Sequence, residues 1–257
     1  MRRYWIDAEQ LHSNHDSGEL VSFDSEQFHH IFDVCRQTLG SRFEVLHPNH
    51  KAYLVEVIDL KKKSALAKVL ESREVPSLPT PHIQLALSIP RFPVFESVLE
   101  KMVEMGVSRV QPFFSEFSFI REPKSFSSEK LVRWKKIVTS ATQQSGRGEL
   151  MQIETPQTWS KMLEQINQDS DSTCLFSYEG QSTLGVKDFL NADSKKNKAL
   201  KSIWLVVGSE GGFSTDEVDQ MQSQGFHPVT LGSQVLRVET ACMTLVSVLK
   251  YEFDLMR

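Results

Sequence analysis

Three prolines within six residues, at positions 76, 79 and 81, constrain this chain more than any other feature of its sequence. Proline fixes the backbone dihedral φ and donates no amide hydrogen bond, so a segment this rich in proline cannot continue a helix. We therefore expect residues 76–81 to form an extended linker between two structural units. A length of 257 residues leaves room for two units of ordinary size.

Residues 1–75 are predicted to form a small β-barrel. Short apolar runs that are typical of strands occupy residues 43–46, 52–58 and 64–69. Turn-forming residues separate these runs, and several short strands in a unit of this length favour a barrel. Three consecutive lysines at residues 61–63 lie in one of the turns, where solvation is the simplest explanation for them.

Residues 82–257 are predicted to form a parallel α/β domain, because strand-like and helix-like segments alternate along them. Strands are expected at residues 82–89, 110–114, 174–178, 203–207 and 226–231. Helices are expected at residues 95–105, 128–141, 158–166 and 214–225, with a last one from residue 239 onward.

Composition limits the class of protein. With 40% hydrophobic residues and a formal net charge of −4, we expect a globular protein that is not a general polycation. Cys35, Cys174 and Cys242 are far apart, so we expect buried thiols in a reducing cytoplasm and no disulfide. No apolar stretch follows Arg2 and Arg3, so no signal peptide is expected, and the longest uncharged stretch, residues 220–236, is too polar for a membrane span. The histidine pairs at residues 29–30 and at residues 47 and 50 have no third ligand nearby, so we expect no metal site.

Two loops at the carboxyl ends of expected strands are the candidate binding site, because ligands of α/β proteins bind at that edge. Residues 208–213 contain three glycines, which would let a ligand approach the backbone, and residues 231–241 form the second loop. Neither loop contains lysine or a phosphate-binding motif. This favours a neutral or cationic ligand, although a glycine-rich segment can also be only a tight turn.

The two loops together resemble the signature loops of the SPOUT RNA methyltransferases. They read GSEGGFS-x-x-E (residues 208–217) and LG-x-x-VLR-x-ETA (residues 231–241), and they are similar to the RsmE type, which methylates N3 of a uridine in 16S ribosomal RNA. Three further segments match motifs of the RsmE type. They are K-x-x-E-x-G-V, which begins at Lys101, W-x-K-I…QSGR, which begins at Trp134, and the pair His30 and Arg36.

The resemblance implies a C-terminal SPOUT-type knotted parallel-sheet domain at residues 82–257, preceded by a small PUA-like β-barrel at residues 1–75 that docks RNA. It also implies a homodimer, with 16S rRNA or the small ribosomal subunit as the partner and S-adenosylmethionine as the cofactor. The residues that would bind this cofactor are Leu205, Val207, Gly208, Glu210, Gly211, Leu231, Gly232, Val235, Leu236 and Arg237.

Methyl transfer to uridine N3 needs positioning and a way to handle the N3 proton, and it needs no metal. We expect Arg237 to stabilise the developing uracil anion, because guanidinium stays charged. Glu210 or Glu239 could orient Arg237 or accept the proton, and Glu239 could instead be an ordinary acidic residue of a first helical turn. Arg36, Arg147 and Lys101 are the candidates for RNA contacts.

The chain departs from the RsmE pattern at four positions. Ser209 stands where the RsmE pattern has a proline, and Gln234 stands where it has an arginine. Phe117, after residues 110–114, also replaces an arginine, and Gln143 occupies a position where the family often has a glutamate. Two lost arginines would weaken phosphate contacts. Two alternatives therefore stay open, namely a SPOUT methyltransferase with another RNA target and a non-catalytic RNA-binding or ribosome-assembly protein that keeps the fold.

Overall fold

The computed structural model describes residues 2–14, 18–180, 184–192 and 200–256 and divides the chain into two compact units. The first comprises Met1–Ser77 with Thr142–Leu150, and the second comprises Leu78–Ala141 with Met151–Arg257. The division between Ser77 and Leu78 falls inside the proline-rich segment. Residues 142–150 belong with the first unit, and nothing in the sequence near residue 142 indicates this. Of the helices in the described segments, none is long and apolar enough to cross a membrane.

The first unit is built on a sheet with strand order β1-β4-β5-β6-β3-β2. Its strands are β1 (Arg3–Trp5), β2 (Leu11–Asn14), β3 (Gly18–Asp24), β4 (Arg42–His47), β5 (Lys51–Leu60) and β6 (Ser64–Glu74). A short helix, α1 (Ser25–Phe28), continues into the π-helix η2 (His29–Val34). Phe23, Phe43 and Val55 lie in a core of their own, so this unit buries its apolar residues without help from the α/β sheet.

The second unit is an α/β domain whose described strand pairs run parallel, in the order β10-β8-β7-β13-β11-β14-β12, with β9 beside β8. The strands are β7 (His82–Ser88), β8 (Arg109–Phe114), β9 (Gln152–Ile153), β10 (Gln157–Thr158), β11 (Ser172–Ser177), β12 (Leu184–Gly185), β13 (Ser202–Val207) and β14 (His227–Thr230). The helices are α2 (Phe92–Glu104), α3 (Ser128–Ser145), α4 (Trp159–Gln168), α5 (Val186–Ala192), α6 (Thr215–Ser223) and α7 (Val238–Glu252). The five strands and five helices expected in this part of the sequence are confirmed.

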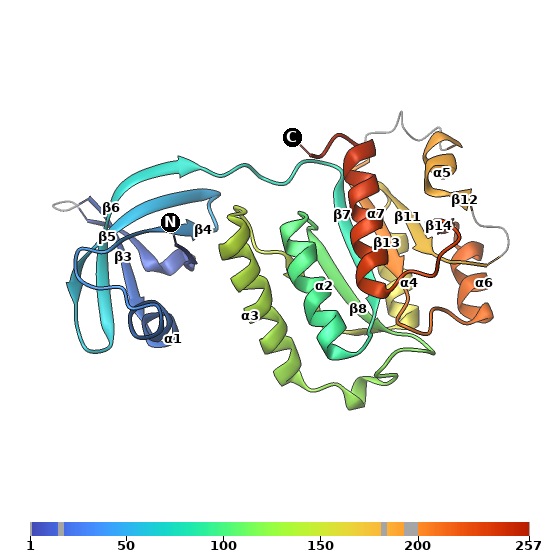
Figure 1. Cartoon of the computed structure of the whole chain (residues 1–257), viewed down its shortest axis with the longest axis horizontal. Coiled ribbons are helices and arrows are strands. Elements are labelled where there is room, and N and C mark those ends of the chain that lie inside the picture. Colours follow the sequence, from blue (N-terminus) through green and yellow to red (C-terminus); the bar gives the residue numbers. More distant parts are fainter. Residues whose placement is uncertain (1, 15–17, 181–183, 193–199, 257) are drawn as a thin grey trace. The chain divides into compact units, whose positions relative to one another are not determined.

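Helices cover both faces of this sheet (Figure 1). Successive side chains of a strand point to opposite faces, so β13 contributes side chains to two hydrophobic cores. Ile203 and Leu205 pack with α2, α3 and α7, whereas Trp204 and Val206 pack with α4 and α6. This explains why residues 203–207 are continuously apolar.

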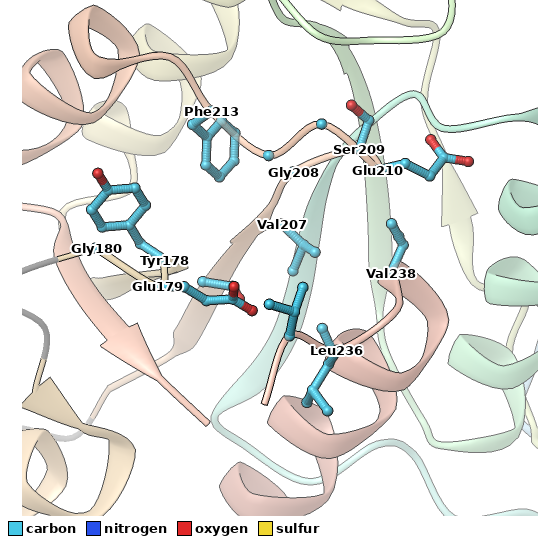
Figure 2. A pocket seen from close by; sticks show the side chains of 15 residues that line it. Tyr178, Glu179, Gly180, Val207, Gly208, Ser209, Glu210, Phe213, Leu236 and Val238 are labelled. Carbon is cyan, nitrogen blue, oxygen red and sulfur yellow. The ribbon is translucent and has the colours of Figure 1, made fainter. Parts of the chain in front are cut away.

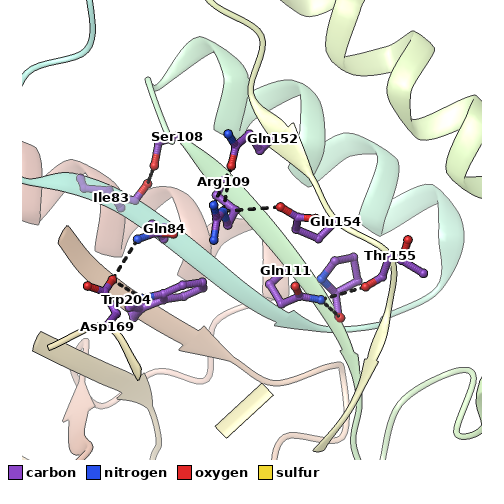
Figure 3. A network of polar contacts seen from close by, with 11 residues as sticks. Ile83, Gln84, Ser108, Arg109, Gln111, Gln152, Glu154, Thr155, Asp169 and Trp204 are labelled. Atoms are coloured by element: carbon purple, nitrogen blue, oxygen red, sulfur yellow. Dashed lines mark hydrogen bonds and ion pairs between the residues drawn. The ribbon is translucent and has the colours of Figure 1, made fainter. Parts of the chain in front are cut away.

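A polar network joins the amino ends of the central strands (Figure 3). One carboxylate oxygen of Asp169 accepts hydrogen bonds from Trp204 Nε1 at 3.0 Å, Gln84 Nε2 at 3.3 Å and the Ser202 hydroxyl. The network ties β7 and β13 to the segment that leads into β11. The opposite, carboxyl ends of these strands lead into the loops that form the candidate site.

Candidate cofactor pocket

A pocket of about 440 Å³ lies at the carboxyl ends of β13 and β11, beside the amino end of α7 (Figure 2). Its walls come from the glycine-rich loop after β13, from the segment after β11 and from the residues that lead into α7. The lining residues are Ser177, Tyr178, Glu179, Gly180, Val207, Gly208, Ser209, Glu210, Gly211, Gly212, Phe213, Val235, Leu236, Val238 and Ala241. The volume is in the range of small-molecule sites.

The glycine-rich loop is a tight turn that its own glycines make possible. A Cβ on Gly208 would lie 2.9 Å from the Gly212 Cα, and the Gly212 amide donates to the Ser209 carbonyl at 2.9 Å. Gly212 has a φ of +69°, in the left-handed region where a side chain is disfavoured. The tight-turn interpretation therefore applies to these residues, which also line the pocket.

The glycine-rich loop is held against the loop that follows β8. The Ser209 hydroxyl donates to the Phe117 carbonyl at 2.6 Å, and a Cβ on Gly211 would lie 2.7 Å from the Phe117 Cβ. Buried Glu217 accepts from the Glu116 amide at 2.8 Å and also completes the cap of α6. Two departures from the RsmE pattern, Ser209 and Phe117, are thus direct neighbours.

Among the described lining residues, Glu179 and Glu210 carry carboxylates, and none carries a basic group. Figure 2 shows the Glu179 side chain pointing into the cavity and Glu210 pointing away from it. A Glu210 oxygen accepts from the Arg91 amide at 3.2 Å, just ahead of α2. Such a lining suits a ligand with positive charge.

The structure brings together part of the predicted cofactor set. Six of its members line the pocket, namely Val207, Gly208, Glu210, Gly211, Val235 and Leu236. Leu205 is buried in the core under the pocket, and Leu231 packs against the same core. Gly232 has a φ of +125°, and Arg237 is the N-cap residue of α7. These four are not among the lining residues.

The predicted catalytic residues Arg237 and Glu239 lie at the amino end of α7. Arg237 is exposed, and its side chain makes no hydrogen bond or ion pair with another described residue. Glu239 is half-buried in the first helical turn. Burial, with a contribution from the Glu239 charge, raises the pKa of the Cys242 thiol, so that this cysteine is inert.

The predicted RNA-binding residues are distributed over both units. Lys101 on α2 pairs with Glu104 at 3.3 Å. Arg36 and Arg147 belong to the first unit. Arg36 is exposed and has a φ of +57°, whereas burial lowers the pKa of Arg147 to about 10. Cys35, expected to be buried, is half-exposed because it follows η2 at the surface.

Sequence reasoning missed one wall of the pocket. Tyr178, Glu179 and Gly180 line it directly after β11, but in the sequence they are an ordinary strand end without a motif. The rule that ligands bind at carboxyl ends of parallel strands could have pointed to them, because β11 is the neighbour of β13.

A parallel sheet with a backbone-lined pocket at its carboxyl edge, joined to a small β unit, defines a two-domain α/β protein that binds a small ligand. The family model of the RNA methyltransferase domain matches residues 76–250, and that of the RNA methyltransferase PUA domain matches residues 23–70. The chain therefore belongs to the RNA methyltransferase family that the sequence motifs indicate.

Relatives with the same printed name match along nearly the whole chain. The ribosomal RNA small subunit methyltransferase E of Aquifex aeolicus is 30% identical over 242 residues, covering 93% of this chain and 97% of its own. That of Buchnera aphidicola is 28% identical over 242 residues, covering 93% and 90%. The crystal structure of the Neisseria gonorrhoeae enzyme bound to S-adenosylmethionine matches with a TM-score of 0.81 and 26% identity, covering 98% and 97%.

Proposed function

We propose that this protein transfers a methyl group from S-adenosylmethionine to N3 of a uridine in small-subunit ribosomal RNA. The observation that carries the proposal is the pocket at the carboxyl ends of β13 and β11, in a domain that matches the RNA methyltransferase family over residues 76–250. Near full-length similarity to small-subunit rRNA methyltransferases supports the choice of substrate.

The lining of the pocket fits S-adenosylmethionine. Apolar side chains of Val207, Leu236 and Val238 suit the adenosine, and backbone groups of the glycine-rich loop can hold its polar edges. The carboxylate of Glu179 faces the cavity and suits the positive charge of the cofactor. When bound, the cofactor supplies an electrophilic methyl group on its sulfonium.

Arg237 and Glu239 are proposed to act on the uridine from the amino end of α7. The N3–H of uridine is a weak acid, so the reaction needs a proton acceptor and a cation near the developing anion. Arg237 flanks the lining residues Leu236 and Val238, and its exposed guanidinium is available to the substrate. Glu239 is proposed as the proton acceptor or as the group that orients Arg237. Glu210 is proposed to position the start of α2, because it accepts from the Arg91 amide.

The first unit is proposed to dock RNA, with Arg36 and Arg147 as contacts, while Lys101 provides one on the second unit. Two lines of reasoning support this assignment: the unit matches an RNA methyltransferase PUA domain, and phosphate contacts fix the orientation of an RNA. We also propose, from the family resemblance, that the protein works as a homodimer in the cytoplasm. Light scattering of the purified protein would give twice the monomer mass.

The direct test is methylation of unmodified small ribosomal subunits, followed by mass spectrometry of the nucleosides. We expect 3-methyluridine in the product. A 2′-O-methylated nucleoside would indicate a SPOUT enzyme with another target, and no product together with no cofactor binding would support a non-catalytic RNA-binding protein.

Arg237→Ala is expected to lower kcat about a hundredfold, the effect of removing one group that stabilises an oxyanion. Affinity for S-adenosylhomocysteine and the melting temperature should stay unchanged, because the side chain makes no hydrogen bond or ion pair with a described residue and Arg237 is not among the lining residues of the pocket. Arg237→Lys keeps the charge and should retain part of the activity. Full activity of Arg237→Ala would exclude Arg237 from the site.

A further inference from the structure

Two exposed phenylalanines lie in the loop that borders the cofactor pocket. Phe117 is 40% exposed and Phe119 is 56% exposed, while Ser118 between them is buried. The Ser118 hydroxyl lies 2.9 Å from that of Ser88 at the end of β7 and accepts from the Ser115 amide at 2.8 Å. The buried serine therefore anchors the loop and leaves both rings outside.

Hydrogen bonds fix the backbone of this loop from both sides. Ser209 donates to the Phe117 carbonyl, and Glu217 accepts from the Glu116 amide. The Phe119 amide donates to the Ile89 carbonyl at 2.8 Å. Rings presented on a rigid loop lose little entropy when a ligand covers them. Exposed aromatic rings on a loop with a fixed backbone are suited to a binding surface.

Cations are interleaved with these aromatic rings. Phe119 packs edge-to-face on Phe92 at 5.6 Å, and the Lys130 ammonium lies 4.3 Å from the centre of the Phe92 ring. Arg121 and Lys124 follow in the same segment and are exposed. Glu116 and Glu122 are also exposed there, so the local charge is mixed. The attraction of this surface to phosphate is therefore modest, and the aromatic rings are its main groups for binding a ligand.

We propose that Phe117 and Phe119 form a stacking platform for unpaired RNA bases next to the nucleotide that is methylated. This inference rests on the proposed function and adds how the substrate is held. The Phe117 carbonyl accepts from the pocket residue Ser209, and the Phe117 Cβ occupies the space beside the pocket residue Gly211, so bases adjacent to a uridine placed against the cofactor would lie near this loop. Sequence-tolerant recognition of single strands uses aromatic rings in this way.

The test compares Phe117→Ala, Phe117→Leu and Phe117→Trp in binding to a short fluorescein-labelled single-stranded RNA that contains the target uridine. Alanine keeps the Cβ beside Gly211 and the carbonyl that accepts from Ser209, so affinity for S-adenosylhomocysteine should not change. Loss of one stacked base should weaken RNA binding about tenfold in the Ala variant. Leucine is apolar but has no aromatic face and should not restore binding, whereas tryptophan should.

Salt dependence separates stacking from charge. The slope of log affinity against log salt should be the same for Phe117→Ala as for the unsubstituted protein, because no phosphate contact is lost. Lys124→Ala should reduce that slope by about 0.7, the value for one contact to a single strand. Tyr251→Ala removes an exposed ring on α7 and is the control that should leave RNA binding unchanged.

Unchanged RNA affinity in both Phe117→Ala and Phe117→Leu would overturn the platform while leaving the proposed function in place. A change in oligomeric mass without a change in RNA affinity would also overturn it and would make this surface a contact between two copies of the chain. If the unsubstituted protein binds the cofactor but no RNA, both the proposed substrate and the platform are overturned.

Discussion

Gly211 shows what a missing side chain does in this site. From the sequence, the glycines of this loop were expected to let the ligand approach the backbone. In the structure, the space that a Cβ on Gly211 would need is already taken by Phe117, at 2.7 Å. The constraint at this residue is the contact between two loops, and it affects the pocket through the position of the glycine-rich backbone.

Gly211→Ala is therefore expected to weaken S-adenosylhomocysteine binding about tenfold, or about 1.4 kcal/mol, because one loop must shift. Titration calorimetry measures this directly. Adding Phe117→Gly removes the opposing Cβ and should restore part of the affinity. Gly225→Ala is the control, because its Cβ would meet nothing within 4 Å and its cost is backbone strain at a φ of +80°. Equal affinities in Gly211→Ala and the unsubstituted protein would contradict the contact.

Elements with a clear period or cap were predictable from the sequence, and elements defined by their partners were not. The capping box from Ser214 to Glu217 predicted the start of α6, and the apolar spacing from Phe95 onward predicted α2. Strands β1, β2 and β12 are too short to show alternation, and η2 begins without a capping residue. The contact of Ser209 with Phe117 joins residues 92 positions apart, and nothing local to either residue indicates it.

Glu217 serves two elements at once, which gives a prediction at this scale. One carboxylate oxygen accepts from the Ser214 amide in the cap of α6, and the other accepts from the Glu116 amide in the loop after β8. Glu217→Gln keeps one acceptor and leaves one amide without its partner. We expect a loss of about 1–2 kcal/mol in the free energy of unfolding, measured with urea.

Asp216→Asn is the matched control for Glu217→Gln, because Asp216 is exposed in the same helical turn. Its expected effect is a few tenths of a kcal/mol through the helix dipole. If the two substitutions destabilise the protein equally, the link between the loops contributes nothing to stability.

At the scale of the whole molecule, the chain builds separate hydrophobic cores. The described apolar clusters around Phe23 and Phe43 belong to the first unit, and those on the two faces of the parallel sheet belong to the second. The two-part architecture was readable from the prolines at 76, 79 and 81. The knotted path comes from the resemblance and stays a prediction, since no composition or spacing encodes which segment passes through which loop.

Separate cores predict that cofactor binding stabilises one unit and leaves the other unchanged. A ligand at a hundred times its Kd adds about 2.7 kcal/mol to the unit that binds it. When hydrogen exchange is measured in the presence of S-adenosylhomocysteine, the backbone amides of residues 202–214 and 231–241 should exchange more slowly. The exchange rates of residues 42–74 should not change. Phe43→Ala should cost the first unit about 3–5 kcal/mol and speed its exchange without altering the cofactor effect, because Phe43 lies in the core of that unit. Equal protection of residues 42–74 by the cofactor would show that the two units unfold together.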